Sequence, residues 1–357
     1  MLKLLKVYQF EAPRVAGPHG GRPGFNPWSK EEIIAANPDI NVDGGLDDLL
    51  DLLKQESQLL VIPAYGDNPE RYLTRTAEMV RTIGTIHEYV ARETFEPGGV
   101  LTRIAKSHLR VGTFEYFASR QQLNDVKMLA DFAIQRHYPE IRETEKHYLE
   151  LLKRVASNQS KLVSKWMSIG FIHGVMNTDN FTISGETIDY GPCAFLDEYH
   201  PGKVFSSIDQ NGRYAFGNQP SIASWNLASL AGCLIAFIDK DSDKANELAT
   251  EVLDNFSKET NQRILDLMCE KIGLNGGKKE NQTLLRNLLK IMMDNEADYT
   301  ITFRNLSKVL FEESDEFFNQ FSEKKEINAW LNNWKQALKN EHKDLSELTN
   351  RLNRINP

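Results

Sequence analysis

Cysteine is scarce in this chain: Cys193, Cys233 and Cys269 are the only three among 357 residues. Their positions show no CxxC pair and no Cys/His spacing of a metal site. We therefore expect free or buried thiols rather than a disulfide framework. A long apolar stretch is also missing from the N-terminal MLKLLKVYQFEAPRV, which argues against a signal peptide or membrane span there. A cytoplasmic location with no membrane partner is the expectation.

Positive charge is in deficit, with 42 Lys and Arg residues against 50 Asp and Glu residues and a net charge of -8. No basic stripe is evident, so a nucleic-acid partner is not expected. The hydrophobic share of 41% is ordinary for a soluble globular protein. A chain of this length has room for two domains or lobes with a large core.

Phosphate-binding glycine motifs are absent as well. Residues 1–45 are rich in proline and glycine, which predicts loop structure. The run GPHGGRPG lacks both the G-x-x-x-x-G-K-[ST] pattern and a strand-flanked G-x-G-x-x-G. A plain coil is therefore favoured over a phosphate loop.

Helical periodicity dominates the rest of the chain, and it predicts a predominantly helical α+β fold. Short strands are expected over Leu59–Ala64, Val100–Ile104 and Arg110–Phe117. Helices are expected over Leu46–Gln58, Glu70–Val90, Asp125–Ile134, Arg142–Ile169 (ending at Gly170) and Ser224–Phe237, with a further series over Ser242–Arg351 that breaks at Gly273–Gly277. Trp225 and Leu227 are expected in the core, and Asn218 and Gln219 are expected to fix a loop.

The chemically richest segment runs from His173 to Pro192, HGVMNTDNFTISGETIDYGP. With Gly185 and Glu186 in the turn of a two-stranded ribbon, Asn180 and Asp189 become diagonal neighbours on one face. Two oxygen ligands held that closely suit Mg²⁺, which takes few protein ligands and adds phosphate oxygens. Asp179 would point to the other side of the pleat.

The same segment is similar to the catalytic loops of kinases, in which an Asp base precedes a metal-binding Asn and a second metal Asp. Asn180 matches that Asn, and Asp189-Tyr190-Gly191 resembles the Asp-Phe-Gly turn. His173-Gly174-Val175 resembles the His-Gly-Asp of small-molecule kinases, with Val175 in place of the base. A valine cannot accept a proton, which disfavours a conventional phosphotransferase.

Longer stretches carry a more specific resemblance. HGVMNTDNFTISGETIDYGPCAFLDEY and FSSIDQNGRYAFGNQPSIASWNL, with RETFEPGGVLTRIAKSHLRVGTFEYFASR upstream, closely resemble the selenoprotein-O (SelO / YdiU) family. The resemblance is strong over residues 92–236 and looser after that. It implies a protein-kinase-like C-lobe over residues 92–357, preceded by an atypical N-terminal region over residues 1–91. It also implies transfer of AMP from ATP to protein hydroxyls.

Site roles follow from that resemblance, residue by residue. Asp179 would accept the proton of a substrate Ser, Thr or Tyr hydroxyl, and Asn180 and Asp189 would bind Mg²⁺ or Mn²⁺. Asp189 would also approach the nucleotide. Arg103 and Arg110 would contact the ATP phosphates, in a nucleotide bound the other way round from ordinary kinases, which exposes the α-phosphate. His173 and His108 are expected to make structural hydrogen bonds.

Residues 1–90 depart from the family, because its glycine-rich segment and its Lys–Glu pair have no match there, and the family's C-terminal tail has no counterpart after Pro357. An alternative function is therefore a catalytically impaired nucleotide-binding scaffold of the same family. The interpretation of the Asp179 segment as an ordinary turn, and of Asn180 and Asp189 as a hydrogen-bonded pair, also stays open.

Overall fold

The structure is a computed structural model, and it describes residues 80–91, 95–103, 105–312, 314–322, 324–342 and 345–356. For residues 80–103 it describes the backbone alone. The chain divides into two compact units, Met1–Lys106 and Ser107–Pro357, and each is described here by itself. The predictions for residues 1–45, 46–58 and 59–64 lie outside the described residues.

The described part of the first unit is an antiparallel pair of strands, β1 (Val80–Ala91) and β2 (Phe95–Arg103). The register joins Val80 to Arg103 and Ala91 to Phe95, with two irregularities between them. The predicted strand at Val100 is confirmed as far as Arg103. The predicted helix over Glu70–Val90 is wrong from Val80 onward, because this stretch is rich in β-branched and aromatic residues that favour a paired strand.

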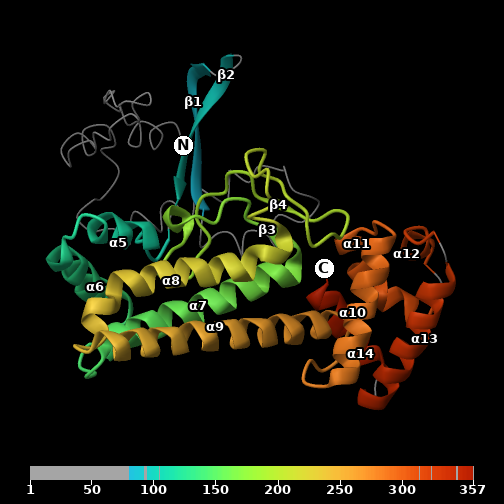
Figure 1. Ribbon diagram of the computed structural model, residues 1–357. Helices are drawn as coiled ribbons and strands as arrows, with labels where there is room; N and C mark the ends of the chain where they lie inside the picture. Colours follow the sequence, from blue (N-terminus) through green and yellow to red (C-terminus); the bar gives the residue numbers. More distant parts are fainter. Residues whose placement is uncertain are drawn as a thin grey trace. The chain divides into compact units, whose positions relative to one another are not determined.

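The second unit is mostly helical (Figure 1). Its longer helices are α5 (Val111–Ala118), α6 (Leu123–His137), α7 (His147–Ile169), α8 (Gln219–Ile238), α9 (Ser242–Lys271), α10 (Lys279–Asp294), α11 (Tyr299–Val309), α13 (Lys324–Glu341) and α14 (Leu345–Ile355). Short elements complete it: α12 (Asp315–Phe318), the 3₁₀ turns η1 (Pro139–Ile141), η2 (Thr178–Asn180) and η3 (Phe216–Asn218), and the strand pair β3 (Phe171–Ile172) with β4 (Ala194–Phe195).

Three long helices, α7, α8 and α9, lie side by side and form the base of the unit (Figure 1). Their apolar faces, with α5 and α6, enclose a first hydrophobic cluster. The predicted helix ending at Gly170 is confirmed, because Gly170 adopts the left-handed conformation, φ 73°, that closes α7. A side chain there would also meet the ring of Tyr299, 2.9 Å from the added Cβ.

Helix α8 confirms the predicted buried helix. Together with η3 it is long and apolar enough to cross a membrane by length and composition alone. In the structure it packs against α5, α7 and α9, and Leu227, Leu230 and Leu234 are fully buried in the first cluster. Its apolar character is thus used in the core, although Trp225 is an exception: 47% of it is exposed, so its predicted core position is wrong.

The segment Arg110–Phe117 is a helix rather than the predicted strand. Its β-branched and aromatic residues favour a strand locally. However, Val111 and Phe114 are three residues apart and fully buried, on the side of α5 that contacts α8. Burial on one helical face outweighs the local preference.

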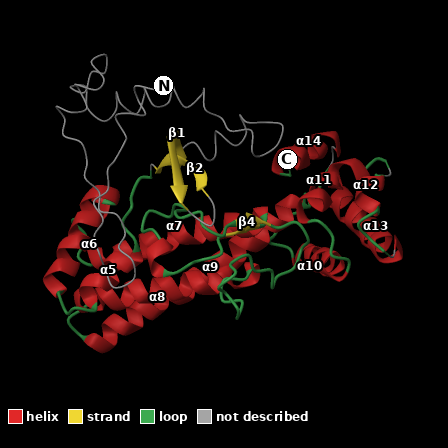
Figure 2. Cartoon of the chain, turned by 90° about the horizontal axis from the view of Figure 1, so that it is seen from above, coloured by secondary structure: helices red, strands yellow, loops and turns green. Residues whose placement is uncertain are grey.

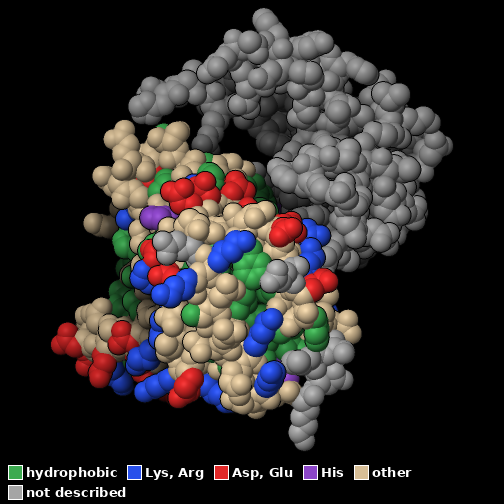
Figure 3. All heavy atoms as spheres, turned by 90° about the vertical axis from the view of Figure 1, so that its right-hand side faces the viewer, with side chains coloured by type: hydrophobic (Ala, Val, Ile, Leu, Met, Phe, Trp, Pro, Cys, Tyr) green, Lys and Arg blue, Asp and Glu red, His purple; other side chains and the backbone are tan. Residues whose placement is uncertain are grey.

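A second hydrophobic cluster lies at the other end of the unit, where α10–α14 gather around the end of α9 (Figure 2). This confirms the predicted helix series and its break after α9, where Gly273 has φ 75°. The outer face of these helices carries both acidic and basic side chains, and no single sign of charge covers it (Figure 3).

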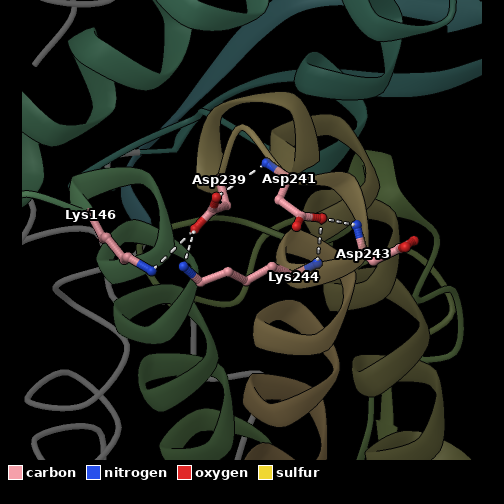
Figure 4. Close-up of polar contacts among 5 residues, drawn as sticks. All are labelled: Lys146, Asp239, Asp241, Asp243 and Lys244. Carbon is pink, nitrogen blue, oxygen red and sulfur yellow. Dashed lines mark hydrogen bonds and ion pairs between the residues drawn. The ribbon is translucent and has the colours of Figure 1, made fainter.

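Ion pairs join the N-terminal ends of α7 and α9 to the residue that follows α8 (Figure 4). Asp239, just after α8, accepts from Lys146 at 3.4 Å and Lys244 at 3.3 Å. Asp241 caps α9 by accepting from the backbone N–H groups of Asp243 and Lys244. Hydrogen bonding from the Asp241 N–H is the main cause that lowers the pKa of Asp239.

Candidate functional site

The site begins where the chain enters α5. Leu109–Val111 runs antiparallel to Phe181–Ile183, with Arg110 bridged to Thr182. The Val111 N–H donates to the Phe181 carbonyl at 2.9 Å, and the Ile183 N–H donates to the Leu109 carbonyl at 3.0 Å. Arg110 and the segment that follows Asp179 and Asn180 are therefore hydrogen-bonded neighbours, although about seventy residues separate them in the sequence.

The hairpin after Asn180 has a longer loop than predicted. Phe181 is bridged to Thr187, so Thr182–Glu186 forms the loop, and the predicted register with Gly185 and Glu186 in a two-residue turn is wrong. The Thr182 hydroxyl donates to the Glu186 carbonyl at 2.8 Å and accepts from the Glu186 N–H at 3.0 Å. These side-chain bonds replace ladder bonds, so the diagonal placement of Asn180 and Asp189 on a ribbon does not hold. Both residues still lie within two positions of the bridged pair.

Buried side chains tie this hairpin to the helices. Tyr138, at the end of α6, donates its hydroxyl to the Ile183 carbonyl at 2.8 Å. Burial is the main cause that raises the pKa of Tyr138, so the hydroxyl remains a donor at neutral pH. Gln159 on α7 donates to the Thr182 carbonyl. The hairpin is thus held from two helices.

His173 has a structural role, as expected. Its Nε2 lies 2.9 Å from the Ile188 carbonyl, which can only accept, so Nε2 carries the proton. Nδ1 accepts from the Val175 N–H at 3.4 Å, which fits the neutral ring. Both nitrogens bind backbone, and His173 links the loop to the residue before Asp189. His108 is exposed.

Two carboxamides on α8 fix the loop that carries the site. Gln219 accepts from the His173 N–H and donates to the Phe171 carbonyl, each at 2.9 Å. Seven residues later, on the same face of the helix, Asn226 donates to the Met176 carbonyl at 2.9 Å. The predicted role of Gln219 is confirmed, whereas Asn218 binds only the Gly212 carbonyl of its own loop. The role of Asn226 is visible only in the structure.

Asp179 and Asn180 lie in η2, directly after the loop that Gln219 and Asn226 hold. Asp179 is exposed, and its carboxylate lies against Gly112 in the first turn of α5. Asn180 is partly buried and donates its Nδ2 to the Val175 carbonyl at 3.0 Å. The amide is thereby oriented, so Oδ1, the atom that a cation would need, is left as the acceptor.

Asp189 stands in a backbone conformation that L-residues rarely adopt, with φ 62°. Asp and Asn tolerate this region better than other side chains, yet it still costs free energy. The bridge between Phe181 and Thr187 and the His173–Ile188 bond hold the residues before it. Strained backbone of this kind clusters at functional sites, which makes Asp189 a candidate on structural grounds as well.

The two predicted phosphate-binding arginines fall in different units. Arg103 is the last residue of β2, and Arg110 immediately precedes α5 in the second unit, where it is exposed. The structure pairs the backbone of Arg110 with Thr182, directly after the turn that carries Asp179 and Asn180. Gly112, which the sequence interpretation missed, lies against Asp179. Its signal was a glycine inside a segment predicted as a strand, which often marks a close approach of another part of the chain.

A metal at this site would be one that needs few protein ligands. Among the described residues no group of three or more His, Cys, Asp and Glu side chains is placed to hold a cation. Asn180 offers an oriented amide oxygen and Asp189 a carboxylate, which are ligand types that Mg²⁺ accepts together with waters and phosphate oxygens.

Comparison with known proteins finds relatives that are named as transferases. A family model described as protein adenylyltransferase SelO matches residues 73–357. Two relatives, from Maridesulfovibrio salexigens and Agrobacterium fabrum, each named protein nucleotidyltransferase YdiU, are 49% identical over 270 and 268 residues. A third of that name, from Rhizobium meliloti, is 46% identical over 270 residues.

The chain therefore belongs to the SelO family, as the resemblance indicated. The matched region begins at residue 73, upstream of the stretch in which the resemblance was strong. The aligned segments cover 75–76% of this chain and 55% of each of these relatives, so the chain spans about half their length.

Proposed function

We propose that this chain is a Mg²⁺-dependent protein adenylyltransferase that transfers AMP from ATP to Ser, Thr or Tyr hydroxyls of other proteins. One observation carries the proposal: the backbone of Arg110 is bridged to Thr182, two residues after Asn180, and the Asp179 carboxylate lies against Gly112 at the start of α5. In the sequence, Val175 stands at the position of the phosphotransfer base of small-molecule kinases. The names of the relatives support the same reaction class. A cytoplasmic location is part of the proposal.

In this reaction Asp179 takes the proton of the substrate hydroxyl, and that oxygen bonds to the α-phosphorus of ATP. The bond from the α-phosphorus to the bridging oxygen breaks, and pyrophosphate leaves with the electron pair. A positioned general base of this kind contributes roughly 10²- to 10⁴-fold.

Binding roles fall to the other residues. Arg110, with Arg103, would hold phosphate oxygens through guanidinium N–H groups that match phosphate geometry. Asn180 and Asp189 would hold Mg²⁺ or Mn²⁺, which neutralises charge on the phosphates when bound. Asp179 stays exposed, where a protein hydroxyl can reach it.

The test is to incubate the chain and an acceptor protein such as casein with ATP labelled at either the α- or the γ-phosphate. Label on protein from the α-position is expected, and label from the γ-position alone would overturn the proposal. The alternative is a nucleotide-binding scaffold of the same family. It predicts no transfer from either position with Mg²⁺-dependent ATP binding intact.

Two variants separate these outcomes. Asp179→Ala is expected to lower transfer by roughly 10²- to 10⁴-fold while Mg²⁺-dependent ATP binding persists. Asp189→Asn keeps a residue that tolerates φ 62° and removes the charge, so ATP binding should lose its Mg²⁺ dependence without loss of folding.

A further inference from the structure

Gly112, the second residue of α5, lies beneath the side chain of Asp179. A Cβ added to Gly112 would overlap Asp179 Oδ1, and it would lie 3.1 Å from Asp179 Cγ and 3.2 Å from its backbone nitrogen. The carboxylate therefore occupies the space that any side chain at position 112 would need.

We propose that Gly112 is a positioning residue for Asp179: its bare backbone leaves the place in which the carboxylate rests against α5. The inference rests on the proposed function, since it gives Gly112 a role in the reaction through Asp179. Nothing in the reaction contacts Gly112 directly.

Helix α5 cannot retreat to make room for a larger residue. Val111 and Phe114, on either side of Gly112, are fully buried in the first hydrophobic cluster. The Val111 N–H is also bonded to the Phe181 carbonyl, two residues after Asp179. The backbone of α5 at Gly112 and the backbone that follows Asp179 are thus hydrogen-bonded to each other.

The overlapping atom, by contrast, is the end of a side chain that rotates. Turning the Asp179 carboxylate away would remove the overlap with a methyl group at position 112. The remaining contact, 3.2 Å to the Asp179 backbone nitrogen, needs a shift of only a few tenths of an ångström. The first turn of α5 contains no acidic residue of its own, and Asp179 supplies negative charge at this helix N-terminus. A rotated carboxylate would leave the helix N-terminus and would no longer lie within hydrogen-bond reach of the substrate hydroxyl.

The variant Gly112→Ala tests this directly, with Gly232→Ala as the matched control. Gly232 is in α8, also within a helix, and an added Cβ there meets nothing within 4 Å. A displacement of about 1 Å in a reacting group costs on the order of 100-fold in rate, so kcat of Gly112→Ala should fall by about that factor. KM for ATP should stay within about threefold, because the proposed contacts to ATP do not include Asp179.

Three outcomes would overturn the inference. One is a Gly112→Ala variant with the kcat of the unsubstituted protein. Another is an equal loss of kcat in Gly232→Ala, which would point to a general effect of alanine in these helices. The third is loss of ATP binding together with kcat, which would indicate collapse of the site rather than displacement of one group.

Thermal unfolding separates this inference from the proposed function, because it needs no turnover. Gly112→Ala is measured with Asp179 present and in an Asp179→Ala background, where the overlapping oxygen is gone. The Tm change on adding the methyl should be more favourable in the second background by about 2 °C or more, since neighbouring residues in contact are not additive.

Equal Tm changes in the two backgrounds would overturn the placement of Asp179 against Gly112. If the unsubstituted protein transfers no AMP and the coupling is nonetheless present, the proposed function fails while the positioning of Asp179 by Gly112 stands.

Discussion

The two hydrophobic clusters of the second unit are built by different means. In the first, which underlies the site, buried carboxamides cross from α8 to chain that has little regular structure, as Gln219 and Asn226 do. In the second, Trp330 stacks on Trp334 with centroids 5.4 Å apart, and both indoles donate to backbone carbonyls. The first cluster is thus joined to the site loop by carboxamides, whereas in the second the polar bonds come from large rings that also pack in the core.

The largest expected effect is in the second cluster. Trp334 is fully buried, and Trp334→Ala should lower the free energy of unfolding by about 3–5 kcal/mol, because a large cavity is left. Denaturant unfolding measures the loss. The matched control is Trp225→Ala, which removes an exposed ring stacked with Arg213 at 4.7 Å and should cost less than about 1 kcal/mol. Equal losses in the two variants would contradict the claim that the buried Trp334 ring stabilises this core by packing.

Lys271 is a buried lysine beside the second cluster. Only 7% of the residue is exposed, and its ammonium lies 4.7 Å from the centroid of the Phe303 ring. Burial lowers the pKa of Lys271 from 10.5 to about 8. The unfolded chain therefore holds this proton more tightly, and the charged lysine costs about 3 kcal/mol of stability below pH 8. Lys271→Met should therefore raise the free energy of unfolding by about 3 kcal/mol at pH 7.

The stability difference between the unsubstituted protein and Lys271→Met should depend on pH. Between pH 8 and 10.5 the unfolded state binds more protons, so the stability of the unsubstituted protein rises and its deficit against Lys271→Met disappears. The control is Lys258→Met, on the exposed side of α9, which should change stability little at any pH. A constant difference between Lys271→Met and the unsubstituted protein from pH 7 to 10.5 would exclude a buried charge.

In the first cluster, Gln219→Ala should cost about 2 to 3 kcal/mol, since it leaves the His173 N–H and the Phe171 carbonyl buried without their partner. Because these groups hold the loop before Asp179, AMP transfer should fall as well. Gln262→Ala, on the exposed side of α9, is the control and should change neither stability nor transfer. Full transfer by a destabilised Gln219→Ala protein would show that the loop keeps its shape without this bond.

The smallest effect is at the break after α9. Glu341 of α13 accepts from the Asn275 N–H at 3.0 Å and from Asn281 Nδ2 at 2.8 Å, and it pairs with Lys278. Burial opposes its charge, but the bonds from Lys278, Asn281 and Asn275 outweigh it and lower the pKa of Glu341. Its contribution is present above its ordinary pKa of 4.5 and is lost as the pH falls through the lowered value.

Glu341→Gln should therefore cost about 1 kcal/mol at pH 7, and less as the pH falls below 4.5. Urea unfolding at a series of pH values measures this, with Glu326→Gln, exposed on the same helix, as the control. A cost that does not change with pH would mean that the carboxylate charge contributes nothing at this break.

The order of the helices along the chain was predictable, because each helix is marked by the spacing of its apolar residues and by signals at its ends. The spacing of apolar residues located α7, α8 and the series from α9 onward, and Gly170 marked the end of α7. The motifs around Asp179, Asn180 and Asp189 were sufficient for the family. These features are local, so they need no knowledge of which segments meet.

Other features depended on contacts between distant segments. The strand predicted at Arg110–Phe117 is the helix α5, because burial of Val111 and Phe114 against α8 outweighs β-propensity. The hairpin register was decided by the Thr182 hydroxyl and by Arg110, which bridges to Thr182 from outside the hairpin.

The sequence by itself determined the family, the helical class and the identity of the candidate residues, because these follow from residue type and spacing. The tertiary structure decided which of them meet: Arg110 lies beside the Asp179 segment, Gly112 lies beneath Asp179, and Gln219 and Asn226 hold the loop. These contacts join residues that are distant in sequence. Their geometry depends on how α5 and α8 pack, which no local pattern contains.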